Sequence, residues 1–316
     1  MSVYLSVSII SFCLSFIFCA VLIPVLKKRK AGQFILSYVK EHNQKSGTPT
    51  MGGLAFILAA SIAAILFIEK FSRTFGVALT IGISYMLVGF LDDLLKRHRK
   101  QNQGLTAAQK IIFQTFVAVL AAIYCLRAEL TTLNLPFLGV EIDLGFWIFP
   151  LAVFVFLATV NTVNLTDGLD GLAAGTSIPF FIVMGVLCVW NEQSGLSVLA
   201  FALAAALAAY LFFNSPPASV FMGDTGSLSL GGFAASIGVF SGNALYIALV
   251  GIMFVVSGIS VIVQVIYYKA TGGKRVFLMS PVHHHFQQRG YSESKIAYAY
   301  SAITTFAGLI ALLGAL

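Results

Sequence analysis

The chain has 316 residues, of which 59% are hydrophobic and only 10% are charged, and its formal net charge is +7. Soluble domains carry about 25% charged residues, so this composition excludes a soluble globular protein and indicates an integral membrane protein. The apolar stretches are roughly 20 residues long, which suits membrane-spanning helices and not the shorter alternating strands of a β-barrel.

Recurring apolar segments predict about ten transmembrane helices in a single polytopic domain, residues 1–316, of the all-α class. An even number of spans places both termini on the same side of the membrane. The outer loop 128–144 alternates apolar and polar residues around Pro136 and Gly139, which predicts a small β-hairpin. The predicted spans are 3–26, 53–69, 75–94, 108–127, 145–163, 174–190, 196–213, 226–242, 244–268 and 296–315.

Basic residues are concentrated in one set of loops. Sixteen of the nineteen Lys and Arg residues lie in or beside the loops 27–52, 95–107, 164–173, 214–225 and 269–295. The positive-inside rule places these loops in the cytoplasm and both termini outside. This distribution accounts for the positive charge without a nucleic-acid partner, and the basic rim would attract anionic headgroups and phosphates.

Acidic residues gather on the same side of the predicted bundle. Seven of the twelve fall there, and none of the twelve lies in the middle of a predicted span. Ion-coupled transporters carry ionisable groups near the bilayer midplane, so the pattern disfavours a transporter, which is kept as a remote alternative. It favours an enzyme that takes one substrate from water and the other from lipid.

The first motif in chain order is GFLDDLLK, in which Asp92 and Asp93 end the third predicted span. Carboxylates at the C-terminal end of a helix oppose its macrodipole, so a cation must help to hold them. Lys96 lies four residues after Asp92 and three after Asp93, so it can serve on a continued helix, as can a divalent metal. The alternative is a helix end whose charges are merely solvated.

Asn164, Asp167 and Asp170 recur at every third position of NLTDGLDGLA. On a helical turn these side chains share one face, and the intervening glycines would let a flat or charged ligand approach the backbone. The alternative is a Gly-rich turn in which they cap helices. The segment contains no basic partner, which favours a ligand site.

Asp224 is the one charged residue of the loop 214–225, within FMGDTGS. Its position before the next span is typical of a helix cap, which is the alternative interpretation. The Gly-rich backbone also resembles the open loops of Mg²⁺ and phosphate sites. Phe221, one turn earlier, offers a face on which a base could stack.

Three of the five histidines, His283, His284 and His285, are consecutive in SPVHHHF. Structural zinc sites use spaced ligands, and three neighbouring side chains cannot easily converge on one ion, so zinc is disfavoured. Imidazoles can donate to phosphate oxygens or carry protons near neutral pH. The alternative is an exposed polar loop.

With KSGTPTMGG (45–53), these motifs in this order make the chain resemble the phospho-N-acetylmuramoyl-pentapeptide transferase family. The family is a branch of the polyprenyl-phosphate N-acetylhexosamine-1-phosphate transferases, and the histidines and GTPTMGG favour it over the sister branch that uses UDP-GlcNAc. The resemblance implies that UDP-MurNAc-pentapeptide and undecaprenyl phosphate give lipid I and UMP, with Mg²⁺. It places the active site on the cytoplasmic face of the bacterial cytoplasmic membrane, and it implies a homodimer inhibited by nucleoside antibiotics.

The resemblance also implies roles for single residues. Asp224 is expected to bind Mg²⁺, Asp92 to deprotonate the lipid phosphate, and Asp93 to position that phosphate or the metal. A two-step route with an Asp nucleophile stays open, and His283 is counted with the catalytic group. The remaining implied substrate-binding residues are Lys45, Thr50, Lys96, Asn164, Asp167, Gly168, Leu169, Asp170, Asn214, Phe221, Gln264, His284 and His285. Ala108 stands where many relatives carry Arg or Lys, whereas Lys110 remains.

Overall fold

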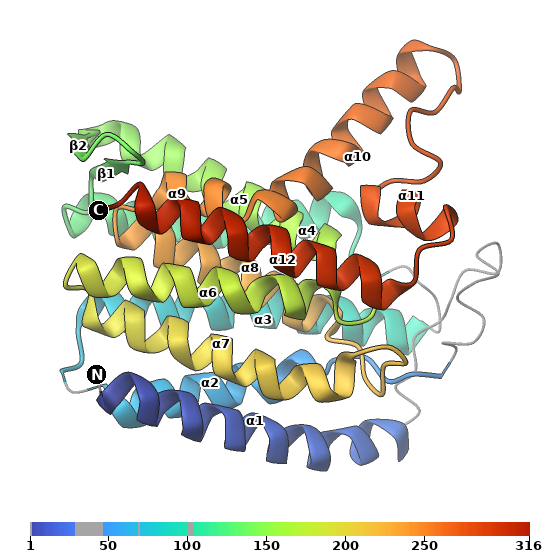
Figure 1. Ribbon diagram of the computed structural model, residues 1–316, viewed down its shortest axis with the longest axis horizontal. Helices are drawn as coiled ribbons and strands as arrows, with labels where there is room; N and C mark the ends of the chain where they lie inside the picture. Colours follow the sequence, from blue (N-terminus) through green and yellow to red (C-terminus); the bar gives the residue numbers. More distant parts are fainter. Residues whose placement is uncertain (1, 29–46, 69, 100–103) are drawn as a thin grey trace.

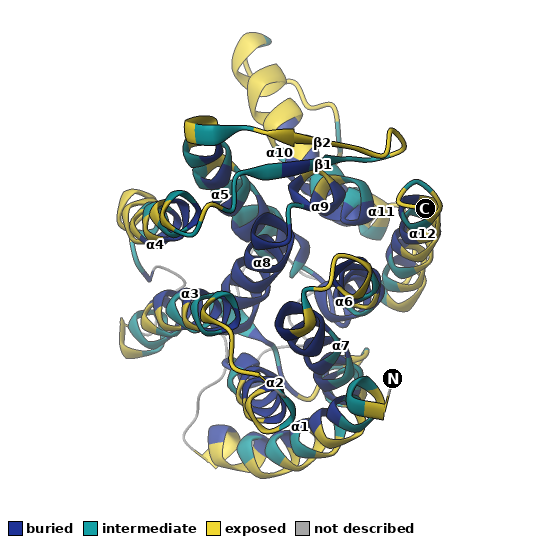
Figure 2. Ribbon diagram, turned by 90° about the vertical axis from the view of Figure 1, so that its left-hand side faces the viewer, coloured by how far each residue is buried: buried dark blue, intermediate teal, exposed yellow. Residues whose placement is uncertain are grey.

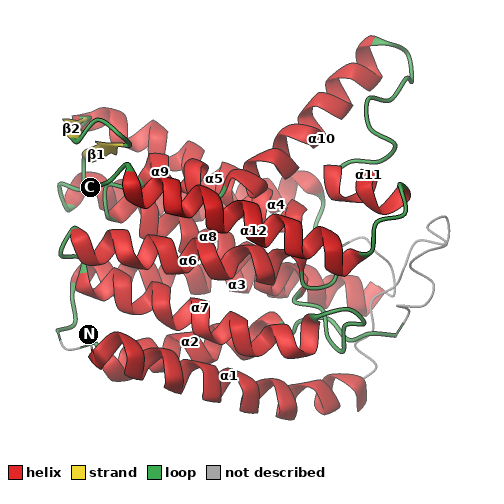
Figure 3. Ribbon diagram, viewed as in Figure 1, coloured by secondary structure: helices red, strands yellow, loops and turns green. Residues whose placement is uncertain are grey.

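The computed structural model describes residues 2–28, 47–68, 70–99 and 104–316. In this part of the chain, helices run side by side between two ends of the molecule (Figure 1). Apart from one small hairpin, the regular structure there is helical (Figure 3). The elements are α1 (Ser2–Lys28), α2 (Gly53–Phe67), α3 (Arg73–Arg99), α4 (Ala107–Arg127), β1 (Thr132–Leu135), β2 (Val140–Asp143), the 3₁₀ turn η2 (Gly145–Trp147), α5 (Ile148–Thr166), α6 (Leu172–Trp190), α7 (Ser194–Asn214), α8 (Gly223–Phe240), α9 (Ala244–Val250), α10 (Ile252–Ala270), α11 (Val282–Gln288) and α12 (Glu293–Leu313).

Eight of the described helices are long and apolar enough to cross a membrane, which confirms the all-α membrane class. They are α1, α3, α4, α5, α6, α7, α10 and α12. Of the other expected spans, α2 has only 15 residues. Helix α8 is rich in Gly and Ser and is buried along Thr225–Phe240, at the centre of the bundle (Figure 2). A helix covered by other helices does not face lipid, so it tolerates small polar residues.

The ninth expected span, 244–268, is wrong as one continuous helix. It is divided at Gly251 into α9 and α10. Gly251 has ψ 29°, which is not helical, and a Cβ there would lie 2.6 Å from the carbonyl oxygen of Ile247. Beyond this break, α10 leans away from the neighbouring helices (Figure 1).

The predicted hairpin in 128–144 is confirmed. Strands β1 and β2 pair antiparallel, with Thr132 opposite Asp143. The backbone N–H of Asn134 donates to the carbonyl of Gly242 at 2.8 Å, and that of Phe137 donates to Gly314 at 2.8 Å. The hairpin and both termini lie at the same end of the bundle, and the motif loops lie at the other end (Figure 1). Which end faces the cytoplasm stays a prediction.

Candidate active site

Three aspartates from two helices meet at the motif end of the bundle. Asp92 and Asp93 lie on the last part of α3, and Asp224 lies in the first turn of α8. Each offers an oxygen within 4.8 Å of the others. Asp92 and Asp93 are only 2% and 3% exposed, so the interpretation of a solvated helix end is wrong. Buried carboxylates require partners, because burial of an unpaired charge costs several kcal/mol.

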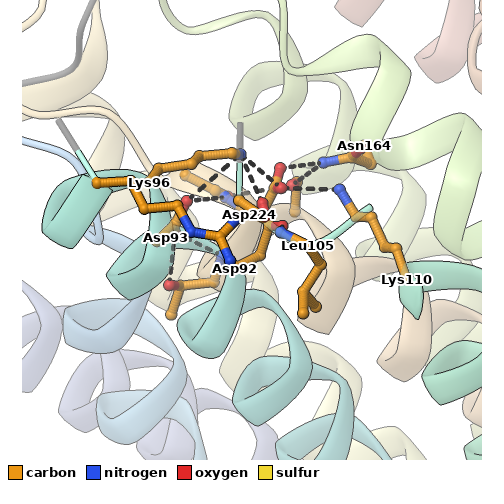
Figure 4. A network of polar contacts seen from close by, with 12 residues as sticks. Asp92, Asp93, Lys96, Leu105, Lys110, Asn164 and Asp224 are labelled. Carbon is orange, nitrogen blue, oxygen red and sulfur yellow. Dashed lines mark hydrogen bonds and ion pairs between the residues drawn. The ribbon is translucent and has the colours of Figure 1, made fainter. Parts of the chain in front are cut away.

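Lys96 supplies the central partner (Figure 4). Its ammonium nitrogen Nζ lies 2.6 Å from Asp92 Oδ2, 2.8 Å from Asp224 Oδ2 and 3.9 Å from Asp93 Oδ1. The expected pairing of Lys96 with the aspartate pair is therefore confirmed. The Lys96 ammonium thus balances the negative charge of carboxylates from both α3 and α8.

Lys110 is a second cation at this cluster, and the sequence did not assign it to the site. Its Nζ lies 2.7 Å from Asp224 Oδ2. The only sequence signal for Lys110 as a site residue was a basic residue in the first turn of α4, two positions after Ala108. Ala108 itself is exposed. Among the ion pairs of the described residues, two ammonium groups face three carboxylates, which leaves one negative charge in excess at full ionisation, so this cluster has capacity for further positive charge.

Asn164 joins the second motif to the third. Its Nδ2 donates to Asp224 Oδ1 at 2.8 Å and to Ser227 Oγ at 2.7 Å. Asp224 therefore directs both carboxylate oxygens at side chains of other helices, and the cap interpretation of Asp224 is wrong. On the opposite side of the cluster, Asp92 Oδ1 accepts from the backbone N–H of Leu105 at 2.7 Å. These contacts bring the ends of α3 and α5 to the starts of α4 and α8 (Figure 4).

Asp170 and Asn214 hold the loop between α7 and α8. Asp170 Oδ2 accepts from the backbone N–H of Ala218 at 3.0 Å, and its own N–H donates to Glu293 Oε2 at 3.0 Å. Asn214 Oδ1 accepts from Gly171 N–H at 3.2 Å, while its Nδ2 donates to the carbonyl of Val220 at 2.9 Å. Both residues have a structural role here, and their contact with substrate stays a prediction.

Asp167 connects the carboxylate cluster to the histidines. It follows the end of α5, and burial together with the neighbouring Asp224 and Asp93 carboxylates raises the pKa of Asp167 well above its ordinary value. The next residue, Gly168, lies directly against the histidine helix α11. A Cβ on Gly168 would collide with His283 Nε2 and would lie 3.0 Å from His284 Nε2. The loop 167–168 thus brings the second and fifth motifs together.

His283 is fully buried, so the alternative of an exposed polar loop is wrong for this residue. Neither of its ring nitrogens has a hydrogen-bond partner among the described residues. Burial, with a smaller effect of His284, lowers the pKa of His283 to about 3, so the ring is neutral at physiological pH. His284 Nδ1 lies 3.0 Å from Gln287 Oε1, and His285 Nδ1 accepts from the N–H of Leu278 at 3.1 Å.

The other candidates surround this centre. Gln264 Oε1 accepts from the N–H groups of Val276 and Phe277 at 3.1 and 3.0 Å, so Gln264 shapes the loop that leads to the histidines. Phe221 pairs through its backbone with Pro49 and Gly52.

Thr50 lies beside Gly223, where an added Cβ would be 2.5 Å from Thr50 Oγ1. Leu169 is buried in a small apolar cluster with Leu172 and Met253. Lys45 lies outside the described residues.

Helices of membrane-spanning length, with buried ionisable groups gathered at one end of the bundle, define a polytopic membrane protein with a buried cluster of ionisable groups. Comparison with known proteins identifies the family. Residues 74–242 match the family model "Glycosyl transferase family 4", and residues 45–57 match phospho-N-acetylmuramoyl-pentapeptide-transferase signature 1.

Relatives with that name include a Clostridium perfringens (strain SM101 / Type A) protein, 43% identical over 94% of this chain and 92% of its own. A Listeria monocytogenes serotype 4b (strain CLIP80459) relative is 41% identical over 98% of both chains. The chain belongs to the phospho-N-acetylmuramoyl-pentapeptide transferase family, which confirms the resemblance found in its motifs.

Proposed function

We propose that the chain transfers phospho-MurNAc-pentapeptide from UDP-MurNAc-pentapeptide to undecaprenyl phosphate. An oxygen of the lipid phosphate forms a bond to the β-phosphorus of the nucleotide sugar, the bond from that phosphorus to the UMP oxygen breaks, and UMP leaves. The product is lipid I. One diphosphate linkage replaces another, so no ATP is required. The printed names of relatives about 40% identical over nearly the whole chain support this activity.

The observation that carries the proposal is the buried cluster in which Lys96 bridges Asp92 and Asp224. Phosphoryl transfer depends mainly on positioning and on neutralisation of phosphate charge, with little covalent work for the protein. Lys96 and Lys110 provide fixed positive charge at the same point. The site lies at one end of the bundle, as a reaction between a lipid phosphate and a soluble nucleotide requires.

The donor set of the cluster fits Mg²⁺. Magnesium prefers a few carboxylate oxygens and completes its coordination with water and substrate phosphates. Asp224, with Asp92, would hold the ion, and the charge excess of the cluster favours it. When bound, Mg²⁺ would neutralise the charge that develops on the transferring phosphates.

The chain's own residues divide the remaining tasks. Asp92 accepts the proton of the lipid phosphate, while the N–H of Leu105 holds its Oδ1 in place. Phe221 provides a face for uracil, and Asp167, Gly168 and the histidines line the sugar-phosphate end. Asp170 and Asn214 keep the intervening loop in position.

The proposal also covers the membrane location, the oligomeric state and the inhibitors of the enzyme. The basic rim supports a location of the cluster on the cytoplasmic face of the bacterial cytoplasmic membrane. The single domain 1–316 acts as a homodimer, and nucleoside antibiotics compete for the uridine pocket.

A transfer assay tests the function. Membranes that contain the protein are expected to move label from UDP-MurNAc-pentapeptide into a lipid extract, dependent on Mg²⁺ and undecaprenyl phosphate. Exchange of the donor for UDP-GlcNAc separates the sister activity, and flux without covalent product would indicate a transporter. A burst of UMP without lipid acceptor would indicate the two-step route through an aspartyl intermediate. Label that stays wholly in water, with both substrates active, contradicts the proposal.

A further inference from the structure

We infer that Asp93 is a positioning residue, which holds the first turn of α8 so that Asp224 faces Lys96 and Lys110. On this assignment Asp93 contacts neither substrate nor metal. The inference rests on the proposed function and deepens it, because it separates the two neighbouring aspartates of GFLDDLLK by role. Asp92 belongs to the reacting cluster, whereas Asp93 acts through Asp224.

Both oxygens of Asp93 are directed at the start of α8. Asp93 Oδ2 accepts from the backbone N–H of Thr225 at 3.0 Å and from its hydroxyl Oγ1 at 2.7 Å. Asp93 Oδ1 lies 3.3 Å from the backbone nitrogen of Asp224. The first N–H groups of a helix have no partner within the helix, and a carboxylate there also favours the positive end of the helix dipole.

Helix α8 has no side-chain cap of its own. The residue before its first turn, Met222, cannot accept a hydrogen bond as Ser, Thr, Asp or Asn would. The side chain of Asp224 is directed at Asn164 and the two lysines. The cap of α8 is therefore supplied by another helix, through Asp93.

Two glycines make this contact sterically allowed. A Cβ on Gly89, one turn before Asp93 on α3, would collide with the carbonyl of Asp224. Gly223 has φ +68°, a region that L side chains rarely adopt, and a Cβ there would collide with Asp93 Oδ2. With no side chain between the two helices, the short Asp93 side chain can reach the first N–H groups of α8.

The position of Asp93 also argues against direct contact of its carboxylate with a substrate or a metal ion. Its nearest approach to the Lys96 ammonium is 3.9 Å, compared with 2.6 Å for Asp92 and 2.8 Å for Asp224. Asp93 thus lies behind the pair that shares the cation.

The test is a double-mutant cycle with Asp93→Asn, Thr225→Val and the double variant. The readouts are the Kd of Mn²⁺, measured by electron paramagnetic resonance on the purified protein, and kcat and the KM for Mg²⁺ in transfer. Thr225→Val removes the hydroxyl that donates to Asp93, and it leaves all carboxylate side chains of the cluster in place. It is expected to weaken Mn²⁺ binding roughly two- to tenfold, the range for one lost hydrogen bond.

Asp93→Asn is expected to weaken Mn²⁺ binding further, and the double variant to be no worse than Asp93→Asn, because contacting residues that act as one unit are non-additive. Thr225→Ser, which keeps the hydroxyl, is expected to restore wild-type affinity. Glu141→Gln, on the exposed strand β2 at the opposite end, is the matched control for unspecific metal binding.

Thr225→Val with wild-type Mn²⁺ affinity and kcat, beside an Asp93→Asn variant that loses both, would overturn the inference. If Asp93→Asn does not fold, the comparison of Thr225→Val with Thr225→Ser decides the question. A wild-type protein that transfers no label would contradict the proposed function, whereas the Mn²⁺ arm would still report on the positioning role of Asp93.

Discussion

The ammonium group of Lys96 lies 2.8 Å from Asp224 Oδ2, and this contact joins α3 to the first turn of α8. The same nitrogen lies 2.6 Å from Asp92 Oδ2. Lys96 therefore occupies the position between two carboxylates that a divalent cation would take. A metal that enters the site must share these oxygens with Lys96 or displace it.

Lys96→Met is expected to strengthen metal binding and to weaken transfer. Loss of the ammonium removes both the competing cation and its repulsion of a divalent ion, so Mn²⁺ should bind roughly tenfold more tightly. The kcat should fall, because a cation near the phosphates is lost. Mn²⁺ titration of the purified protein checks the first effect, with exposed Lys274→Met as control. Unchanged Mn²⁺ affinity would mean that Lys96 and the metal do not compete.

Asp224→Asn is expected to abolish turnover without unfolding the protein. The amide keeps the shape of the side chain and an acceptor for Asn164, but it loses the charge that holds both lysines and the metal. A decrease in kcat of about a thousandfold is expected, as for removal of a key electrostatic group. Turnover and the thermal unfolding midpoint are measured on the same preparation. A folded variant with near-normal kcat would refute the assignment of Asp224.

His283 is expected to make stability depend on pH. Burial lowers its pKa in the folded protein to about 3, compared with an ordinary value of 6.5. The unfolded chain therefore binds a proton that the folded protein does not bind as the pH falls below 6.5. Its contribution to stability is fully present above pH 6.5 and is lost toward pH 3, by up to about 1.4 kcal/mol per pH unit.

Replacement by His283→Gln should remove this part of the pH dependence. Thermal unfolding midpoints between pH 7 and pH 5 should decrease more steeply for the wild type than for the variant. Parallel profiles would show that His283 keeps its ordinary pKa in the folded protein.

The orientation of the bundle can be measured by labelling introduced cysteines. Glu141→Cys lies on β2 at the hairpin end, and Arg289→Cys lies after α11 at the motif end; both positions are exposed. In intact cells without an outer membrane, an impermeant maleimide should label Glu141→Cys only, and lysis should make Arg289→Cys reactive. The opposite pattern would reverse the proposed topology.

The sequence predicts the helical class and the hairpin well, because span-length apolar runs and turn residues are local signals. It does not predict the break at Gly251, where the apolar pattern continues through a non-helical residue. The apolar pattern also cannot tell a lipid-facing helix from α8, which is covered by other helices.

The motifs predict which residues gather in the site, but they do not predict which partner each residue contacts or which role it has. Spacing on α3 correctly indicates that Lys96 can reach the aspartates. The partner of Lys110 depends on how α4 and α8 pack, and the contact of Asp93 with Thr225 joins residues 132 positions apart. Such contacts have no local signal, so they require the fold.

Reconstitution of the purified wild type and Asp224→Asn in vesicles that contain undecaprenyl phosphate tests the proposed transfer directly. UMP release and lipid-linked MurNAc-pentapeptide are counted together after addition of UDP-MurNAc-pentapeptide and Mg²⁺. One UMP is expected for each lipid-linked product with the wild type, and neither product is expected with the variant. Equal product formation by both proteins, or no lipid-linked product from a folded wild type, would contradict this expectation.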